Sequence, residues 1–226
     1  MTKFFVPLHH AAISVFAMLA LLLMFALPAR SDVNIQEVHS QKGITAWLVE
    51  DYTVPIVTLR FAFEGGSSQD PDGKEGLADL MSGLFDEGAG DLDSDAFQEK
   101  LDDVGAEMRF SSSRDAIYGS MRVLAEDRPA AFDLLRLALL QPRFDQQPMD
   151  RIRNQILTGI DAAERDPNAQ ARKRWMRAIY GEHPYARPDE GTRQSLAAIA
   201  PEDLRAFRKS QFARSGLHVA VVGAVD

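Results

Sequence analysis

The stretch from Gly65 to Gly88 constrains the fold of this chain more than any other part of its sequence. It begins as a glycine-rich loop and continues into a segment whose apolar residues recur at the spacing of a helix. These apolar residues are Leu77, Leu80, Met81, Leu84 and Phe85. Because they fall at positions i, i+3, i+4, i+7 and i+8, residues 76–85 are predicted to form a helix that turns one face to the core.

Three residues of the same segment occupy the places of a catalytic motif. Asp79, Ser82 and Gly83 stand where an inverted zinc motif, His-x-x-Glu-His, carries its first histidine, its glutamate and its second histidine. In such a motif the two imidazoles share a helix face and bind one Zn²⁺, while the glutamate activates the metal-bound water. With its glycine-rich entry and residues 76–78, the stretch resembles the active-site helix of pitrilysin/insulinase-type peptidases and mitochondrial processing peptidases.

The resemblance implies a third zinc ligand, a glutamate on a later helix, at the position of Gly159. The four matching positions, Asp79, Ser82, Gly83 and Gly159, then offer one carboxylate, one hydroxyl and two glycines without side-chain donors. A tetrahedral zinc site needs three protein donors. We therefore predict a non-catalytic family member with a degenerate motif, with no metal ligand, catalytic residue or cofactor in this chain, and expect zinc in a partner subunit.

A second motif extends the resemblance toward the C-terminal end. Residues 181–191 are similar to the family's loop His-Pro-Tyr-Gly-x-Pro, which lies over the cleft, and they place His183, Tyr185 and Arg187 there. No second histidine or cysteine lies close to His183 in the sequence, so a packed loop histidine is favoured over a catalytic one. These three residues are candidates for substrate binding.

Residues 1–31 have the form of a secretory signal peptide. A basic start precedes an apolar run from Ala11 to Leu27, and small residues follow it. Cleavage after Ala29 or after Ser31 fits this pattern. An uncleaved anchor is the alternative, because the run is only slightly shorter than the ~20 residues of a membrane-spanning helix. We predict export to the periplasm and no membrane association after cleavage.

The composition argues against some classes of partner and indicates what stabilises the fold. The formal net charge of −8 argues against nucleic acid or anionic lipid as the main partner. The chain has no cysteine, so its stability must come from a hydrophobic core rather than from disulfides. Residues 32–226 are long enough to form one such domain, and the resemblance identifies them as the N-terminal domain of the family, with the second homologous domain absent.

The remaining patterns predict an α+β domain. Strands are expected at residues 45–50, 56–63, 107–112, 116–124 and 217–226, and helices at 94–104, 127–140, 149–165, 169–180 and 201–212. Strands cluster in pairs and helices in runs, which favours α+β over alternating α/β. We predict two layers, a mainly antiparallel sheet with helices on one face, like the processing peptidases and the LuxS-like metalloenzymes.

These observations predict the non-catalytic subunit of a periplasmic heterodimeric zinc metallopeptidase. The partner would be a homologous subunit with an intact zinc motif, and the substrate an unfolded or extended peptide. In the family, capture of peptide proceeds by addition to a sheet edge, which needs a sheet and a cleft but no metal. The chain is predicted to be inactive by itself.

Two alternatives stay open at the level of sequence. One is a structural scaffold without turnover. The other is a hydrolase with an unorthodox metal site built from carboxylates around the motif, a composition that favours Ca²⁺ or Mg²⁺ over catalytic Zn²⁺. The carboxylates concerned are Asp79, Asp86, Glu87, Asp91, Asp93 and Asp95.

Overall fold

A computed structural model describes Met18 and residues 33–225 of the chain. The chain divides into two units, residues 1–34 and residues 35–226, and the second holds every element discussed below. Apart from Met18, the predicted signal peptide lies outside the described residues. No helix within the described part is long and apolar enough to cross a membrane.

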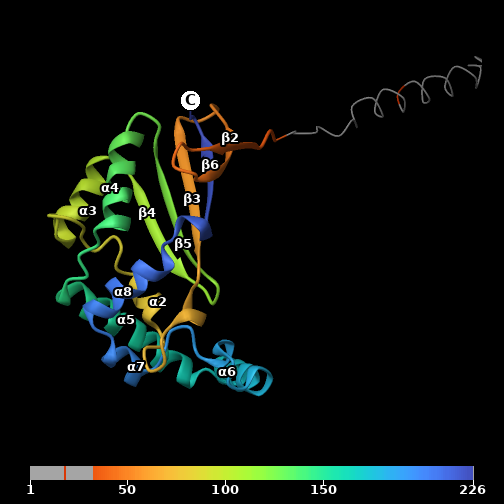
Figure 1. Cartoon of the computed structure of the whole chain (residues 1–226), viewed down its shortest axis with the longest axis vertical. Coiled ribbons are helices and arrows are strands. Elements are labelled where there is room, and N and C mark those ends of the chain that lie inside the picture. The colour runs from red at the N-terminus through yellow and green to blue at the C-terminus, as the bar shows by residue number, and fades with distance from the viewer. Residues whose placement is uncertain (1–17, 19–32, 226) are drawn as a thin grey trace, which may run out of the picture. The chain divides into compact units, whose positions relative to one another are not determined.

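A six-stranded sheet forms one layer of the second unit (Figure 1). Its strands are β1 (Gln36–His39), β2 (Thr45–Glu50), β3 (Ile56–Glu64), β4 (Glu107–Ser112), β5 (Ala116–Leu124) and β6 (Leu217–Gly223). They lie in the order β1-β2-β6-β3-β5-β4. Only β2 and β6 pair in parallel, and all other neighbours are antiparallel. β4 therefore lies at one edge of the sheet.

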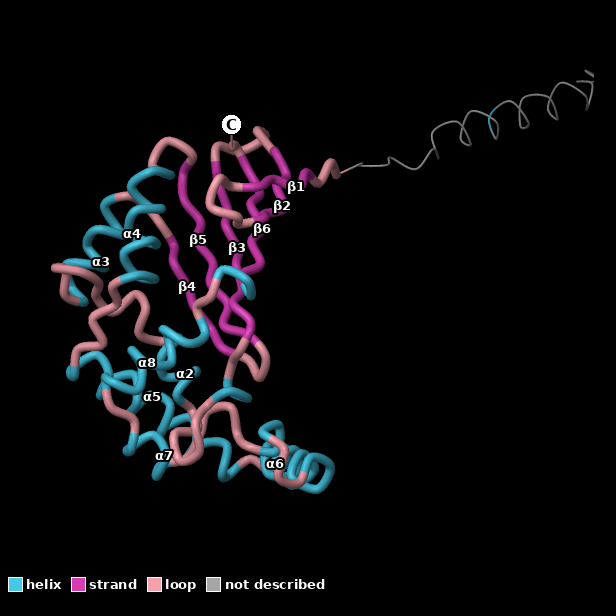
Figure 2. Tube along the Cα trace, in the orientation of Figure 1, coloured by secondary structure: helices cyan, strands magenta, loops and turns pink. Residues whose placement is uncertain are grey.

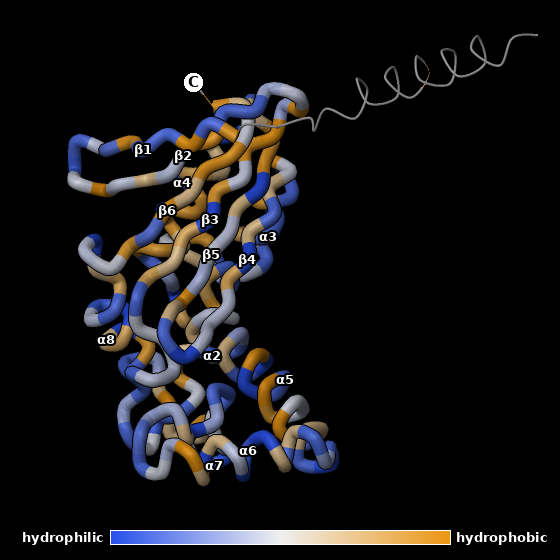
Figure 3. Tube along the Cα trace, turned by 90° about the vertical axis from the view of Figure 1, so that its right-hand side faces the viewer, coloured by the Kyte–Doolittle hydropathy of each residue, from blue (hydrophilic) through white to orange (hydrophobic). Residues whose placement is uncertain are grey.

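Helices cover one face of the sheet (Figure 2). Those among the described residues are α2 (Leu77–Ser82), α3 (Ser94–Asp103), α4 (Arg128–Leu140), α5 (Gln146–Arg165), α6 (Pro167–Tyr180), α7 (Arg193–Ala198) and α8 (Pro201–Gln211). Figure 3 looks onto the opposite face, where no helix lies over the strands. On β5 this explains why Ile117, Met121 and Val123 are buried whereas Tyr118 and Arg122 are exposed.

The prediction of a two-layer, mainly antiparallel α+β fold is confirmed. Helix α5 begins at Gln146 rather than at residue 149, because Pro148 lies in its first turn, where no backbone N–H is needed. Helix α2 ends at Ser82 rather than at residue 85, although Leu84 and Phe85 are still buried beyond its end. The short elements β1 and α7 carry too few residues for a clear periodicity and were not located from the sequence.

Two apolar clusters fill the space between the layers, one around α2, α5 and α8 and one under α3 and α4. Phe110 of β4 and Phe212 after α8 pack against both clusters. The ring of Phe85 lies between them, with centroid distances of 4.8 Å to Phe110 and 5.2 Å to Phe212. This aromatic group fixes the C-terminal end of the α2 segment against the sheet.

Candidate functional site

Asp70 fixes the start of α2, the helix that carries the degenerate motif. Its side chain is 4% exposed and accepts two backbone hydrogen bonds, from Gly76 N at 2.8 Å and from Ala78 N at 2.9 Å. These amides would otherwise have no partner in the first turn. Burial raises the pKa of Asp70 to about 7, against the opposing effect of the backbone hydrogen bonds. The carboxyl is thus a structural cap in a poorly solvated place.

The loop of residues 181–191, called the cleft loop below, packs closely against the segment that leads into α2. Gly76 and Gly191 both have positive φ, 89° and 78°. A Cβ on Gly191 would lie 2.1 Å from the carbonyl oxygen of Glu75, and one on Gly76 would lie 2.5 Å from that of Glu190. The same Glu75 oxygen accepts a hydrogen bond from Ser195 Oγ at 2.7 Å. The two backbones approach as closely as glycine allows.

Asp79, at the first ligand position, is bonded to the edge strand β4. It is half-buried, and its Oδ1 accepts a hydrogen bond from Ser112 Oγ of β4 at 3.3 Å. Burial raises the pKa of Asp79, the bond from Ser112 opposes this, and the charges of Glu190 and Asp189 add to the rise. Its carboxyl links α2 to the edge strand.

Ser82, at the position of the catalytic base, is used inside its own helix. Its side chain is buried, and its Oγ donates a hydrogen bond to the carbonyl oxygen of Asp79 at 2.8 Å. A hydroxyl engaged in this way has no basicity to offer a water molecule.

The two glycines of the motif lie in opposite surroundings. A Cβ on Gly83, at the second histidine position, would lie 2.8 Å from Ile152 Cγ2 of α5, so α5 packs directly on this side of α2. A Cβ on Gly159, at the third ligand position, would have no heavy atom within 4 Å. Close packing is therefore found at Gly83, at the C-terminal end of α2. At Gly159, where a glycine in the middle of a helix could indicate a close neighbour, the position faces open space.

Within the described part of the chain, no group of three or more His, Cys, Asp or Glu residues could hold a metal ion. The carboxylates near the motif serve separate local roles. Glu87 accepts a hydrogen bond from Ser94 Oγ and forms an ion pair with Arg151, while Asp93 caps α3 through Ala96 N. Asp91 and Asp95 are exposed, and burial raises the pKa of the half-buried Asp86. They do not converge on one point.

The loop residues His183, Tyr185 and Arg187 are brought to the same end of the sheet. His183 Nδ1 accepts a hydrogen bond from Tyr185 N, which starts the short helix at Pro184–Ala186. Tyr185 Oη donates to Asp115 Oδ1 at 2.6 Å, and Arg187 donates to the Asp70 carbonyl oxygen at 3.0 Å. His183 is therefore a capping residue, and the other two tie the loop to the hairpin turn and to α2.

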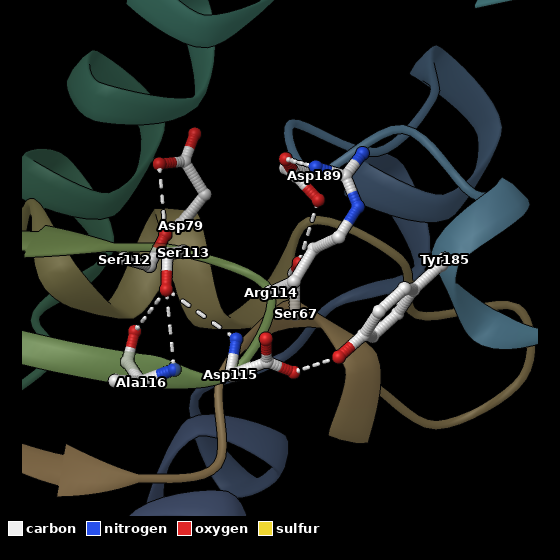
Figure 4. A network of polar contacts seen from close by, with 9 residues as sticks. All are labelled: Ser67, Asp79, Ser112, Ser113, Arg114, Asp115, Ala116, Tyr185 and Asp189. Carbon is white, nitrogen blue, oxygen red and sulfur yellow. Dashed lines mark hydrogen bonds and ion pairs between the residues drawn. The ribbon is translucent and has the colours of Figure 1, made fainter. Parts of the chain in front are cut away.

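Figure 4 shows the polar network that joins these parts. Ser67 Oγ donates to Asp189 Oδ1 at 2.8 Å, and Arg114 Nη1 lies 2.9 Å from Asp189 Oδ2. Arg114 belongs to the turn between β4 and β5, and Ser67 follows β3. Sequence reasoning placed that turn correctly but gave no role to its side chains, because their partners are seventy or more residues away. A Gly-Ser sequence at the end of β3 was the only local signal.

A cavity of about 420 Å³ opens beside this network, between α6 and the cleft loop. It is lined by residues of the hairpin turn, the end of α5, α6 and the cleft loop, among them Arg114, Ala163, Lys173 and Asp189. Arg114 Nε is buried and has no hydrogen-bond partner in the described part of the molecule. Ala163 lies one helical turn beyond Gly159 on α5, so the cavity opens on the helix face that carries the third ligand position.

The cap at Asp70 predicts an unusual dependence of stability on pH. The pKa of this carboxyl rises from an ordinary 3.8 to about 7 on folding, so the folded chain binds its proton more tightly than the unfolded chain. The contribution of Asp70 to the free energy of unfolding is full below about pH 4 and is lost as the pH rises to about 7. Urea denaturation across this range measures it, with a slope of up to about 1.4 kcal/mol per pH unit.

Asp70→Asn should flatten the profile, because a carboxamide does not titrate and still accepts one of the two backbone hydrogen bonds. Asp102→Asn, on the exposed face of α3, is the matched control and should leave the slope unchanged. Parallel profiles for the original chain and Asp70→Asn would contradict the assignment.

Comparison with known proteins places the chain in a family. Residues 46–193 match the model of the insulinase family, peptidase family M16. A Helicobacter pylori protein named non-peptidase homolog YmxG is 25% identical over 184 residues, which cover 81% of this chain and 41% of that protein. The probable mitochondrial-processing peptidase subunit beta of Arabidopsis thaliana is 24% identical, over 81% of this chain and 34% of its own length.

Among solved structures, the peptidase M16 inactive domain from Pseudomonas fluorescens is similar, with a TM-score of 0.81 and 29% identity over 86% of this chain and 47% of that one. This chain thus spans less than half the length of these relatives. The prediction of a family member with a degenerate zinc motif is confirmed. The chain belongs to the insulinase family of peptidases, family M16, and carries Asp79, Ser82, Gly83 and Gly159 where the resemblance places the zinc ligands and the base.

Proposed function

We propose that this chain is the non-catalytic subunit of a two-subunit zinc peptidase of the periplasm. In this function it helps to enclose the reaction chamber and holds an extended peptide, while a homologous subunit with an intact motif binds zinc and cleaves. One observation carries the proposal above all: the frame around α2 is maintained in detail by Asp70, Gly76 and Gly191, although the positions that perform the chemistry offer no usable donors.

The chemistry of α2 supports an inactive role. A zinc peptidase needs three ligands and a base close to the metal-bound water. Here Ser82 Oγ donates into its own helix, Gly83 faces Ile152, and Asp79 is held by Ser112 of β4. A single carboxylate of raised pKa cannot substitute for two imidazoles and a glutamate.

The sheet supports the peptide-holding role. No strand of the described part pairs with the outer side of β4, so its backbone is open to an extended chain. β4 ends at Ser112, which contacts Asp79 on α2, and the following turn carries Arg114 into the cavity beside the cleft loop. A peptide added to β4 would thus run past the degenerate site toward that cavity.

The names of the relatives give limited support for pairing with a second subunit. One is named a subunit of a processing peptidase, one a non-peptidase homolog, and one an inactive domain. A chain without zinc ligands can take part in peptide hydrolysis only if another subunit supplies the zinc, which is why a ligand-bearing homologue is the proposed partner.

We expect the purified protein to cleave no unfolded peptide by itself and to raise hydrolysis at least about tenfold when it is mixed with a homologous subunit that carries His-x-x-Glu-His. The measurement is cleavage of a quenched fluorescent peptide by each protein alone and by the mixture, with and without a chelator. Elemental analysis should assign the zinc to the partner.

Ser112→Pro on β4 tests where the peptide binds, because the register with β5 turns the Ser112 N–H to the open edge and proline removes it. Ser112→Ala controls for the lost hydrogen bond to Asp79. Ser120→Pro, inside the sheet on β5, is unsuitable because it would break a ladder, so Glu37→Pro on the opposite edge strand β1 serves as the control. Chelator-sensitive cleavage by this chain alone would overturn the proposal in favour of an unorthodox metal site. Equal activity of the mixture with either proline variant would remove β4 as the peptide-holding edge.

A further inference from the structure

Helix α6 carries an unusual concentration of unpaired positive charge. Its fourteen residues include Arg172, Lys173, Arg174 and Arg177 and no acidic residue. None of the four cations forms an ion pair within the described part of the molecule, whereas Arg153 on α5 and Arg193 on α7 do. The formal net charge of the chain is −8, so this basic helix has a charge opposite to that of the chain as a whole.

The same helix exposes an apolar stripe. Trp175 is 58% exposed and Ile179 is 55% exposed, and they lie at i and i+4 on one face together with Ala171. At 100° per residue, Arg172 and Arg174 border this stripe on its two sides. No residue of α6 is buried, and neither Trp175 nor Ile179 is among the residues that line the cavity beside the helix. Tryptophan bordered by arginine is the composition of a protein-docking surface.

A surface of opposite character lies beside α3, far from α6 in Figures 1 and 3. An open hollow of about 700 Å³ is lined by Gly90, Asp91, Leu92, Leu137, Gln141, Pro142 and Arg143, and Arg143 is neutralised there by Asp145 at 2.6 Å. The helix that follows exposes Asp95, Glu99 and Asp102 on one face, and none of these forms an ion pair among the described residues.

We propose that the α6 stripe docks in this hollow, next to the acidic face of α3, on a second copy of the chain. Trp175 and Ile179 would contact Leu92 and Leu137, and the arginines that border the stripe would face the carboxylates of α3. The two surfaces lie on separate elements at different ends of the unit, so they complement each other between molecules and not within one.

The small apolar surface of α6 and the negative charge of the chain favour a protein over a membrane as the partner of the stripe. An interfacial helix inserts a broad apolar face, whereas α6 offers two large apolar side chains. The acidic remainder of the chain would also be repelled by anionic lipid. The proposal is independent of the peptidase function, since it needs neither zinc nor a homologous subunit.

Sedimentation velocity on the purified protein, from about 1 to about 100 µM, tests the association. We expect concentration-dependent growth from monomer to dimer or to longer assemblies. Trp175→Ala combined with Ile179→Ala should weaken the association at least about tenfold. Arg122→Glu, an exposed cation on the helix-free face of the sheet, is the control and should leave it unchanged.

A charge swap identifies the docking partner of α6. Arg172→Glu with Arg174→Glu should abolish the association, and so should Asp95→Lys with Glu99→Lys, while an equimolar mixture of the two variants should associate again. Circular dichroism confirms that each is folded. A monomer at every concentration, or a mixture that stays monomeric, overturns the proposal. Binding of α6 to anionic vesicles, lost in the Trp175→Ala, Ile179→Ala variant while the protein stays monomeric, would replace it with a membrane surface.

Discussion

Restoring the four motif residues is expected to give only weak zinc binding until Ile152 is also made smaller. The restoring substitutions are Asp79→His, Ser82→Glu, Gly83→His and Gly159→Glu. At Gly83 the new Cβ would lie 2.8 Å from Ile152 Cγ2, a branched side chain that has little freedom in a helix. At Gly159 the added side chain enters open space. Of the two glycine positions, only Gly83 is therefore blocked by a packing contact.

Adding Ile152→Ala should tighten zinc binding by about 10- to 100-fold, the size of effect seen when a metal ligand gains or loses its supporting contacts. Competition with a zinc-binding dye measures the affinity, and elemental analysis after dialysis gives the stoichiometry. Ile156→Ala, one turn further along α5, is the matched control and should give no such gain. Equal affinities with and without Ile152→Ala would show that α5 yields freely at this point.

Gly191→Ala is expected to lower the free energy of unfolding by about 3 kcal/mol or more, whereas Gly73→Ala should cost only about 1 kcal/mol. The two glycines have nearly the same φ, 78° and 77°. A Cβ on Gly73 meets nothing within 4 Å, but one on Gly191 would lie 2.1 Å from a backbone oxygen of Glu75. The pair thus separates the cost of a left-handed residue from the cost of forcing two backbone segments apart.

Urea denaturation at one fixed pH measures both variants. Gly191→Ala should also loosen the entry to α2, because the Glu75 oxygen that it displaces is the acceptor for Ser195 Oγ. Faster hydrogen exchange of the Ala78 amide, which Asp70 caps, would report this loosening. A loss in Gly191→Ala no larger than that in Gly73→Ala would mean that the loops are not locked together.

The sequence predicts the layers of this fold well because each long element has its own signal. Alternation along β5 and the helical stripe of α5 are properties of neighbouring residues. β5 forms at the predicted residues, and α5 differs from the prediction only in its first turn. The motif on α2 also predicts the family, since its frame is a local sequence.

The surroundings of the motif could not be predicted in the same way. The contact between Gly83 and Ile152, the close approach of Gly191 to Glu75 and the bond from Ser112 to Asp79 all join residues far apart in the chain. Nothing in the sequence near Asp70 distinguishes a buried cap from an ordinary loop aspartate. Packing between elements decides these features, and a single sequence carries no direct signal for it.

The open edge of β4 has a consequence for handling and storing the protein. An unpaired strand attracts any extended chain, including the same edge of another molecule, and such pairing leads to aggregation. Glu107 and Arg109 are exposed on this strand, and charges of this kind oppose flat stacking of identical edges. Protection by charge alone is partial, so the chain should stay soluble longest at low concentration or with a ligand on β4.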